Sequence, residues 1–475
     1  MPFCAENRLH YFFKPIIMVF DMMEDSMTRK DAATGPDFSP VRGKRLLIAL
    51  SGGADSVALA VMLAEAREEY DLTLCAVHVD HGIRPESAED AEFCRRLCGR
   101  LDIPFCTERV DAPGMARRER CGLETAARYL RLWVLERAFD QTRSDYIVTA
   151  HHMDDQAETV LMHLARGAGM EGLCGMRTLF GEFYRPLLQY RKAELTRYLA
   201  ARGYAWREDS TNRVADNPRN ALRLKVIPEI ERWYPGFVRA AARCADTAQI
   251  ESDYLDEQTY AFIQKGGACP FCAWLEVDPP PHRAILRRAI RGRSPEALDW
   301  EQVNVLEALC GQKRGKLDIG ADYFAERTGH RLYFVPKSPP EIAPVTLALE
   351  GETRLAGIGS VVAGPGPAMP IRDDANRQAL NPEALRGAVL RTRRPGDRIR
   401  PLGCGDKLLS DYLIDRKVDR PLRDAVPLVA IGDRVLWAVG LGIAQEARLT
   451  DEGPAVILKY IPETTNDDGG EYHGE

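Results

Sequence analysis

The chain has 475 residues, of which 45% are hydrophobic and 28% are charged, so it is able to form hydrophobic cores and is not a disordered polymer. This length indicates roughly three domains of about 150 residues each. The 64 Lys and Arg and the 70 Asp and Glu give a formal net charge of −6, which excludes a globally basic nucleic-acid-binding protein but not a local basic surface. The 12 Cys are scattered, as is typical of reduced thiols in a cytoplasmic protein.

The first 41 residues are interpreted as a variable N-terminal extension. Their most apolar stretch, residues 11–23, contains Lys14 and Pro15 and is too short to span a bilayer. The stretch also lacks the small-residue cleavage pattern of a signal peptide. We therefore expect a cytoplasmic protein that has no membrane partner. Several methionines lie between residues 18 and 27, and we hypothesise that translation starts at one of them.

Short apolar runs alternate with helical patterns between residues 42 and 216. Strands are predicted at residues 46–50, 72–79 and 146–150, and helices at 57–66, 86–101, 124–139 and 157–165. This alternation predicts an α/β domain with a doubly wound parallel sheet.

The pattern changes after about residue 217. Helices are predicted at residues 237–264, 282–291 and 299–309, so the region 217–340 is expected to be mainly helical. A Pro-rich stretch at 336–344 is interpreted as a linker. Residues 345–463 combine short β-like runs with Gly and Pro turns and predict a small α/β C-terminal domain, which a polar tail follows at 464–475.

A Gly-rich loop lies between the first predicted strand and the first predicted helix, with the sequence Ser51-Gly52-Gly53-Ala54-Asp55-Ser56. Its glycines let backbone N–H groups approach an anion, and the N-terminus of the helix adds a positive dipole end. The two serine hydroxyls are able to donate to phosphate oxygens. Asp55 does not suit direct phosphate binding and indicates Mg²⁺ or a substrate cation. The chain lacks a GxxxxGK[ST] motif at this loop, and an ordinary turn with helix caps is the alternative that we favour less.

This loop resembles the PP-loop of the ATP-pyrophosphatases, which adenylate a substrate and release pyrophosphate. Two His-containing segments, at 78–84 and 151–159, follow predicted strands, where α/β sheets build their sites. The second, with the pattern HHxDDQxET, closely resembles the tRNA(Ile)-lysidine synthetase family. Further segments resemble the same family, in order along the chain: 124–129, 166–169, 172–173, 185–188, 208–212 and Arg219-Asn220 with Arg223.

The resemblance implies that lysine is joined to C2 of the wobble cytidine of an isoleucine tRNA with a CAU anticodon. ATP would first adenylate the cytidine oxygen, and the lysine amine would then displace AMP. The implied pyrophosphate and ATP contacts are Ser51, Gly52, Gly53, Ala54, Asp55 and Ser56. Asp55 would hold Mg²⁺, and Arg128 would neutralise the α-phosphate. Because free lysine has a pKa of about 10.4, a group must orient its amine and take its proton; the candidates are His151, Asp155 and Glu158.

A second block of resemblance lies at residues 391–398, 407–423 and 437–440. Between Arg386 and Arg423 there are 11 Lys and Arg against 5 Asp and Glu, a local net charge of +6. We name this segment the basic island. It suits contacts with tRNA phosphates, although a solvated charged face is the alternative. Base stacking is considered for three aromatic residues, with core packing favoured for each: Trp206, Trp233 and Tyr234.

Two cysteine pairs and two other functions are also weighed. Cys269 and Cys272 form a CxxC that is able to bind zinc or an iron–sulfur cluster, but no second pair lies nearby. Cys94 and Cys98 lie one helical turn apart, and we interpret both pairs as structural thiols.

The runner-up functions are a tRNA-thiolating PP-loop enzyme and an inactive nucleotide- or RNA-binding protein. The oligomeric state stays open, with a homodimer as one candidate.

Overall fold

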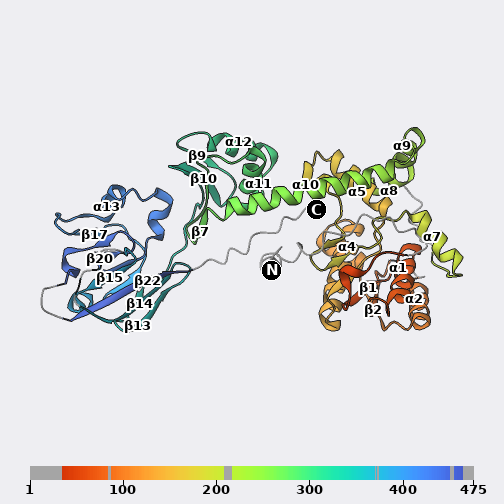
Figure 1. Ribbon diagram of the computed structural model, residues 1–475, viewed down its shortest axis with the longest axis horizontal. Coiled ribbons are helices and arrows are strands. Elements are labelled where there is room, and N and C mark those ends of the chain that lie inside the picture. The colour runs from red at the N-terminus through yellow and green to blue at the C-terminus, as the bar shows by residue number, and fades with distance from the viewer. Residues whose placement is uncertain are drawn as a thin grey trace. The chain divides into compact units, whose positions relative to one another are not determined.

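A computed structural model describes residues 35–83, 87–207, 217–367, 369, 371, 374–449 and 454–463. The chain forms two compact units, which divide between Asp253 and Tyr254 within the long helix α10 (Phe237–Ile263). Each unit is described by itself below (Figure 1). The expectations for the N-terminal methionines, Arg84, residues 208–212 and the polar tail lie outside the described residues. No described helix combines the length and the apolar character that crossing a membrane requires.

The first unit contains a six-stranded sheet. In spatial order its strands are β3 (Phe105–Arg109), β2 (Thr73–Asp80), β1 (Arg45–Ala49), β4 (Tyr146–Val148), β6 (Phe183–Tyr184) and β5 (Leu179–Phe180). Neighbouring strands are parallel except for the β5–β6 hairpin. The predicted parallel sheet is therefore confirmed.

Helices cover both faces of this sheet. The described helices are α1 (Ala54–Ala66), α2 (Ser87–Leu101), α3 (Ala112–Glu119), α4 (Leu123–Thr142), α5 (Met153–Ala165), α6 (Met170–Leu173), α7 (Lys192–Ala201), α8 (Pro218–Ala221), the π-helical turn η5 (Leu222–Val226) and α9 (Ile227–Trp233). Because side chains alternate along a strand, Leu46 and Ile48 of β1 pack in the core with α1, α2 and α7, whereas Leu47 packs with α4 on the other face. The apolar runs of the sequence reflect this burial on both faces.

Three details of this unit differ from the sequence prediction. β3 was not predicted because it is an edge strand whose side chains are mostly exposed, so its sequence has no apolar run. α3 was also missed, since Pro113 and Gly114 resemble a turn; Asp111 caps this helix by accepting from the Gly114 N–H. α5 begins at Met153, four residues before the predicted start at residue 157, because polar residues cap its first turn.

The order of the strands creates a switch point. The chain runs from β1 outward to β2 and β3, and then returns to place β4 on the opposite side of β1. In open α/β sheets, ligands bind at the carboxyl ends of the strands where the order reverses in this way. The Gly-rich loop follows β1, and the two adjacent histidines follow β4. Both predicted motifs therefore meet at one end of the sheet.

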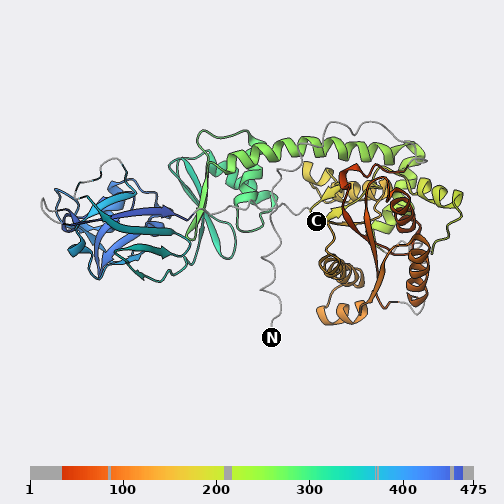
Figure 2. The same ribbon diagram turned by 60° about the horizontal axis from the view of Figure 1, so that its bottom comes forward.

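The second unit begins with a small sheet that the sequence analysis did not predict. Its antiparallel strands, in spatial order, are β7 (Gly267–Cys269), β8 (Cys272–Glu276), β11 (Arg331–Pro336), β10 (Tyr323–Thr328) and β9 (Gly315–Asp318). α11 (Arg283–Arg293) and α12 (Trp300–Cys310) pack against it, as both views show (Figures 1 and 2). The region 217–340 still has more helix than strand, as expected. The strands were missed because they are short and carry charged residues.

The C-terminal part of this unit is built mostly of strands. One sheet has the order β12 (Val345–Thr346), β16 (Val389–Arg391), β19 (Leu428–Ile431), β20 (Arg434–Ala438), β17 (Arg398–Ile399) and β18 (Lys407–Leu408), with β21 (Gly442–Ile443) on β20; the other has the order β13 (Gly351–Leu355), β14 (Gly359–Gly366), β22 (Ala455–Pro462) and β15 (Arg377–Leu380). The helical elements are α13 (Leu409–Asp415) and the 3₁₀ turns η6 (Pro382–Leu385), η7 (Arg420–Ala425) and η8 (Gln445–Ala447). Trp437, which is fully buried, anchors a core between strands of both sheets.

Candidate active site

The Gly-rich loop is held from inside by Ser56. The Ser56 hydroxyl accepts from the N–H groups of Ser51 and Gly52, each at 3.2 Å, and donates to the Gly53 carbonyl at 3.0 Å. Gly52 has φ +88°, and a Cβ there would lie 3.2 Å from Cys94 Sγ, so this position favours glycine. Ser56 was predicted as a phosphate donor, but its hydroxyl is committed to shaping the loop.

Asp55 has one carboxylate oxygen without a hydrogen-bond partner. Its Oδ2 lies 3.6 Å from His152 Nε2 and 3.7 Å from Lys192 Nζ, whereas its buried Oδ1 has no partner among the described residues. Buried carboxylate oxygens are normally hydrogen-bonded, so this one fits a missing cation. Within the described parts of the chain, no three His, Cys, Asp or Glu gather to hold a metal ion. Mg²⁺ usually binds through one or two protein carboxylates and completes its shell with phosphates and water.

His152 connects the loop to helix α5. This histidine is 2% exposed. Its backbone N–H donates to Asp155 Oδ2 at 3.0 Å, and its ring Nε2 lies 3.4 Å from the same oxygen. Burial acts to lower the pKa of His152, but the contact with the Asp55 carboxylate and the charge of Asp155 outweigh it and raise the pKa. His152 was not among the predicted site residues, although the adjacent His pair in the sequence was the signal for it.

His151 is held as a neutral imidazole. Its Nδ1 lies 2.9 Å from the Thr149 hydroxyl. Burial lowers the pKa of His151 to about 4; the charge of Asp155 opposes this shift, whereas the charges of Arg185 and Arg219 add to it. Near neutral pH, an uncharged ring is therefore present at the carboxyl end of β4, where it is able to accept a hydrogen bond.

Asp155 and Glu158 form ion pairs with two arginines, which lie on α8 and η5. Arg219 Nη2 and Arg223 Nη2 lie 3.4 and 3.0 Å from Asp155 Oδ1. Glu158, which is 1% exposed, accepts from the Nε of Arg219 at 2.8 Å and from the Nε of Arg223 at 2.6 Å. Burial acts to raise the pKa of Asp155, but the charges of His152, His151 and Arg219 lower it overall. Asp155 is thus kept ionised, and both oxygens of Glu158 are occupied.

These ion pairs explain why residues 217–253 belong to the first unit. Apolar residues of α5 also pack with α9 and α10, through Met153, Ala157, Ile227 and Val238. The boundary that the sequence analysis placed after residue 216 therefore does not coincide with the division between the two units. The sequence showed a change of pattern at residue 217 but not the pairing across it.

Two further arginines are candidates for the site. Arg128, on α4, is exposed, and its side chain has no hydrogen bond or ion pair to any residue in the described part of the chain. Arg185 follows β6; its Nη1 donates to the Arg177 carbonyl at 3.0 Å, and its buried Nε has no partner among the described residues. Arg185 lies in a segment that the sequence analysis matched but was not itself predicted as a site residue. Its unsatisfied nitrogen suits an anionic substrate.

The three aromatic residues considered for stacking have different surroundings. Trp206 packs against the core of the first unit, as expected. Trp233 and Tyr234 are 70% and 73% exposed, so the expected core packing is wrong for both. They lie where α9 ends, in the short connection that precedes α10.

Most cations of the basic island are paired with acids. Arg391 is fully buried and donates two 2.7 Å hydrogen bonds to Asp397. Further pairs in or next to the island are Arg386–Glu383, Arg393–Asp424, Arg398–Asp406, Lys407–Asp415 and Arg420–Glu326. Arg394, Arg400 and Lys417 are exposed and have no acidic partner among the described residues. The local charge of +6 therefore overstates how many cations are available to RNA.

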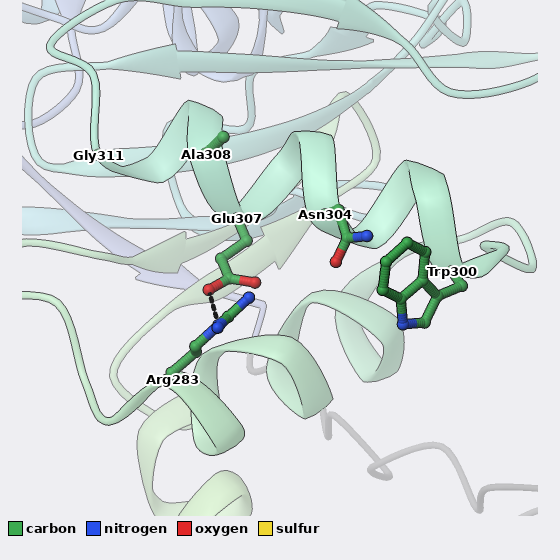
Figure 3. A pocket seen from close by; sticks show the side chains of 6 residues that line it. All are labelled: Arg283, Trp300, Asn304, Glu307, Ala308 and Gly311. Atoms are coloured by element: carbon green, nitrogen blue, oxygen red, sulfur yellow. Dashed lines mark ion pairs between the residues drawn. The ribbon is translucent and has the colours of Figure 1, made fainter. Parts of the chain in front are cut away.

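A separate pocket lies between α11 and α12 in the second unit. Its volume is about 350 Å³, and it is lined by Arg283, Trp300, Asn304, Glu307, Ala308 and Gly311 (Figure 3). Glu307 pairs with Arg283 and with Arg287, so its carboxylate is already engaged by two arginines. It contains none of the motif residues, and we do not assign the reaction to it.

The switch point, the Gly-rich loop and the acids beside it define a PP-loop nucleotide-binding domain. A family model for the PP-loop domain matches residues 26–230, and a model for the TilS substrate C-terminal domain matches residues 388–458.

Full-length relatives give the family. The chain is 31% identical over 440 residues to a tRNA(Ile)-lysidine synthase of Caldanaerobacter subterraneus subsp. tengcongensis, covering 88% of this chain and 94% of the relative. It is 34% identical over 441 residues to the synthase of Symbiobacterium thermophilum, covering 84% and 90%, and 31% identical over 467 residues to that of Geobacter sulfurreducens, covering 92% and 97%. The chain belongs to the tRNA(Ile)-lysidine synthase family.

Proposed function

We propose that the protein uses ATP to join L-lysine to C2 of the wobble cytidine in the CAU anticodon of isoleucine tRNA, and releases AMP and pyrophosphate. Family membership supports this reaction, since the relatives are named for it. The observation that carries the assignment of the site is the unpartnered Oδ1 of Asp55 in the Gly-rich loop, whose other carboxylate oxygen, Oδ2, lies 3.6 Å from His152 Nε2.

The first step makes a leaving group. The C2 oxygen of cytosine leaves poorly, but after it attacks the α-phosphate of ATP and pyrophosphate departs, it leaves as part of AMP. The backbone N–H groups of the loop and the N-terminus of α1 bind the departing phosphates. Arg128 and Arg185 neutralise charge on the α-phosphate, because each guanidinium has donor groups to spare. Asp55 would hold Mg²⁺, which would supply further neutralisation of phosphate charge when bound.

The second step needs a neutral amine. The ε-ammonium of lysine has a pKa of about 10.4, so a proton must leave before nitrogen attacks C2. Asp155, which is kept ionised, attracts the ammonium, and the neutral ring of His151 accepts the proton that the ammonium releases. Glu158 was predicted to share this role. We assign it instead to positioning, since Glu158 is 1% exposed, against 8% for Asp155, and both its oxygens accept from Arg219 and Arg223.

Two other readings are less well supported. A thiolating enzyme would need a sulfur-handling centre in the PP-loop domain, whereas the CxxC pair Cys269 and Cys272 belongs to the other compact unit. An inactive binding protein would not need the network of ionised Asp155 and neutral His151. We propose that the protein acts in the cytoplasm, where its tRNA is found. We also propose that the C-terminal domain contacts the tRNA. A homodimer remains a prediction.

The test is direct. The protein is incubated with ATP, labelled lysine and an isoleucine tRNA transcript, and label is counted on the RNA. A transcript with uridine in place of the wobble cytidine, and a reaction without ATP, are the controls. We expect label only on the cytidine transcript and only with ATP. Absence of label there, with transfer from a labelled sulfur donor instead, would favour the thiolating enzyme.

A further inference from the structure

Cys269 and Cys272 face each other at the tip of a hairpin. They are the last paired residues of the antiparallel strands β7 and β8, and Pro270 and Phe271 form the two-residue turn between them. Their Sγ atoms lie 3.8 Å apart. Directly opposed residues of antiparallel strands have Cα atoms about 4.5–5.5 Å apart, which lies within the range that a disulfide spans. Small rotations of the two side chains are therefore enough to bring the sulfurs to bonding distance.

We propose that Cys269 and Cys272 form a reversible dithiol–disulfide couple, in which Cys269 attacks a low-molecular-weight disulfide and Cys272 resolves the adduct. This site is independent of the lysine-transfer reaction and lies in the other compact unit. Metal binding is a weaker reading of the CxxC, because the described residues offer no third His, Cys, Asp or Glu beside it.

The surroundings give the two thiols different roles. Cys269 is half-buried, so a small oxidant is able to reach it, whereas Cys272 is 3% exposed. The hydrogen bond from Cys272 lowers the pKa of Cys269 to about 7, although burial opposes this shift. The same hydrogen bond, burial and the negative charge of Cys269 raise the pKa of Cys272. Near neutral pH, Cys269 is therefore the thiolate and the attacking group.

The reaction balances with one equivalent of disulfide. The Cys269 thiolate attacks one sulfur of the oxidant, which breaks its S–S bond and releases one thiolate. Cys272 then loses its proton and attacks Cys269 Sγ, which forms the protein disulfide and releases the second thiolate. Two protein thiols are oxidised, one disulfide is reduced to two thiols, and the reverse exchange restores the dithiol.

Oxidation also changes how the hairpin tip is held. Phe271 is buried in the core of the C-terminal part, and Cys272 Sγ lies 3.7 Å from the Pro421 carbonyl oxygen. Formation of the disulfide draws Cys272 Sγ toward Cys269 and removes its proton, so this contact changes when the couple is oxidised. Pro421 belongs to η7, within the basic island. The redox state of the pair is thus coupled to the segment that carries the unpaired cations.

The chain contains its own comparison pair. Cys94 and Cys98 lie one turn apart on α2, and both are fully buried. Burial raises the pKa of each thiol to about 12, so neither is a thiolate near neutral pH. A small disulfide should not oxidise this pair in the folded protein.

The experiment uses the full-length protein. It is equilibrated in glutathione buffers from reducing to oxidising, acid-quenched, denatured, alkylated and analysed by peptide mass spectrometry. We expect an internal disulfide between Cys269 and Cys272 at the oxidising end, whereas Cys94 and Cys98 remain alkylated. In a short pulse of alkylating reagent at pH 7, Cys269, whose pKa is lowered to about 7, should react at least about tenfold faster than Cys106. The side chain of Cys106 is exposed, but partial desolvation of its thiol raises the pKa of Cys106.

Two variants distinguish the roles. Cys272→Ser should accumulate a glutathione adduct on Cys269, and Cys269→Ser should leave Cys272 unmodified over the same time. The proposal is overturned if both thiols of the native chain stay alkylatable in oxidising buffer, if Cys272→Ser traps no adduct, or if the purified protein holds stoichiometric zinc that protects both thiols. Each readout is a covalent mass, so none depends on whether the protein transfers lysine.

Discussion

Arg223 forms a bidentate ion pair with the buried carboxylate of Glu158: its Nε lies 2.6 Å from Oε1 and its Nη2 lies 3.0 Å from Oε2. The pair joins the middle of α5 to the π-helical turn η5. Arg219 adds a second guanidinium from α8. Because Asp155 shares both arginines, the same pairs set the position of an acid at the proposed lysine site.

Glu158→Gln should destabilise the first unit. The substitution keeps the shape of the side chain but removes one of the two carboxylates that pair with the partly buried guanidinium groups of Arg219 and Arg223, which costs about 3 kcal/mol. Urea unfolding should show this loss. Glu229→Gln is the matched control, since Glu229 pairs with Arg232 at 3.8 Å on an exposed surface and should change stability by less than about 0.5 kcal/mol. Equal stabilities of the two variants would contradict the assigned role of Glu158.

Stability should fall between pH 6.5 and 4, in part because of His151. Burial lowers the pKa of this residue to about 4 in the folded protein, whereas an unfolded histidine has a pKa of about 6.5. Within this window the unfolded chain binds a proton that the folded protein does not, so unfolding becomes more favourable as the pH falls. The contribution is absent above pH 6.5 and reaches about 2–3 kcal/mol near pH 4.

Replacing His151 by Asn should remove this contribution. Free energies of unfolding, measured at intervals from pH 4 to 7, should decline less steeply for His151→Asn than for the native chain. His330→Asn, at an exposed histidine paired with Asp278, is the control and should keep the native slope. A His151→Asn curve parallel to the native one would show that His151 titrates normally in the folded protein.

Asp55→Asn should weaken the binding of Mg²⁺-ATP and slow pyrophosphate release by at least about 100-fold. The asparagine side chain has no negative charge, and an NH₂ group replaces one of the two carboxylate oxygens. The position of the unpartnered Oδ1 therefore no longer attracts a cation. Nucleotide binding is followed by titration calorimetry with and without Mg²⁺. Asp145→Asn, at the opposite end of β4, is the control. If the Mg²⁺ dependence of binding survives in Asp55→Asn, another group holds the cation.

The sequence was sufficient to predict those parts of the molecule in which a chemical motif directly follows an apolar strand pattern. The Gly-rich loop and the two histidines follow strands buried on both faces, and such strands read as continuous apolar runs. The edge strand β3 and the small sheet of the second unit have no such run. The pairing of Glu158 with Arg223 joins residues 65 positions apart, which no local pattern encodes. The commitment of the Ser56 hydroxyl to its own loop likewise depends on geometry.

Arg128→Ala should slow adenylation of tRNA by about 100-fold, with little effect on stability. The side chain has no partner in the described part of the chain, so its loss leaves nothing buried and unsatisfied. Arg137→Ala on the same helix is the matched control, because Arg137 pairs with Glu108 at 3.0 Å and is not assigned to the substrate. Single-turnover formation of pyrophosphate measures the step. Similar rates for both variants would remove Arg128 from the site.

Arg394→Ala should weaken tRNA binding by about threefold to tenfold and reduce the slope of log affinity against log salt by about 1. Arg394 is one of the cations of the basic island without an acidic partner among the described residues, so its charge is available to a phosphate. Arg386→Ala removes the same charge from the same segment, but Arg386 pairs with Glu383 at 2.8 Å. Filter binding at several salt concentrations compares the two. Equal losses for both variants would mean that total charge, and not the unpaired cations, determines the affinity.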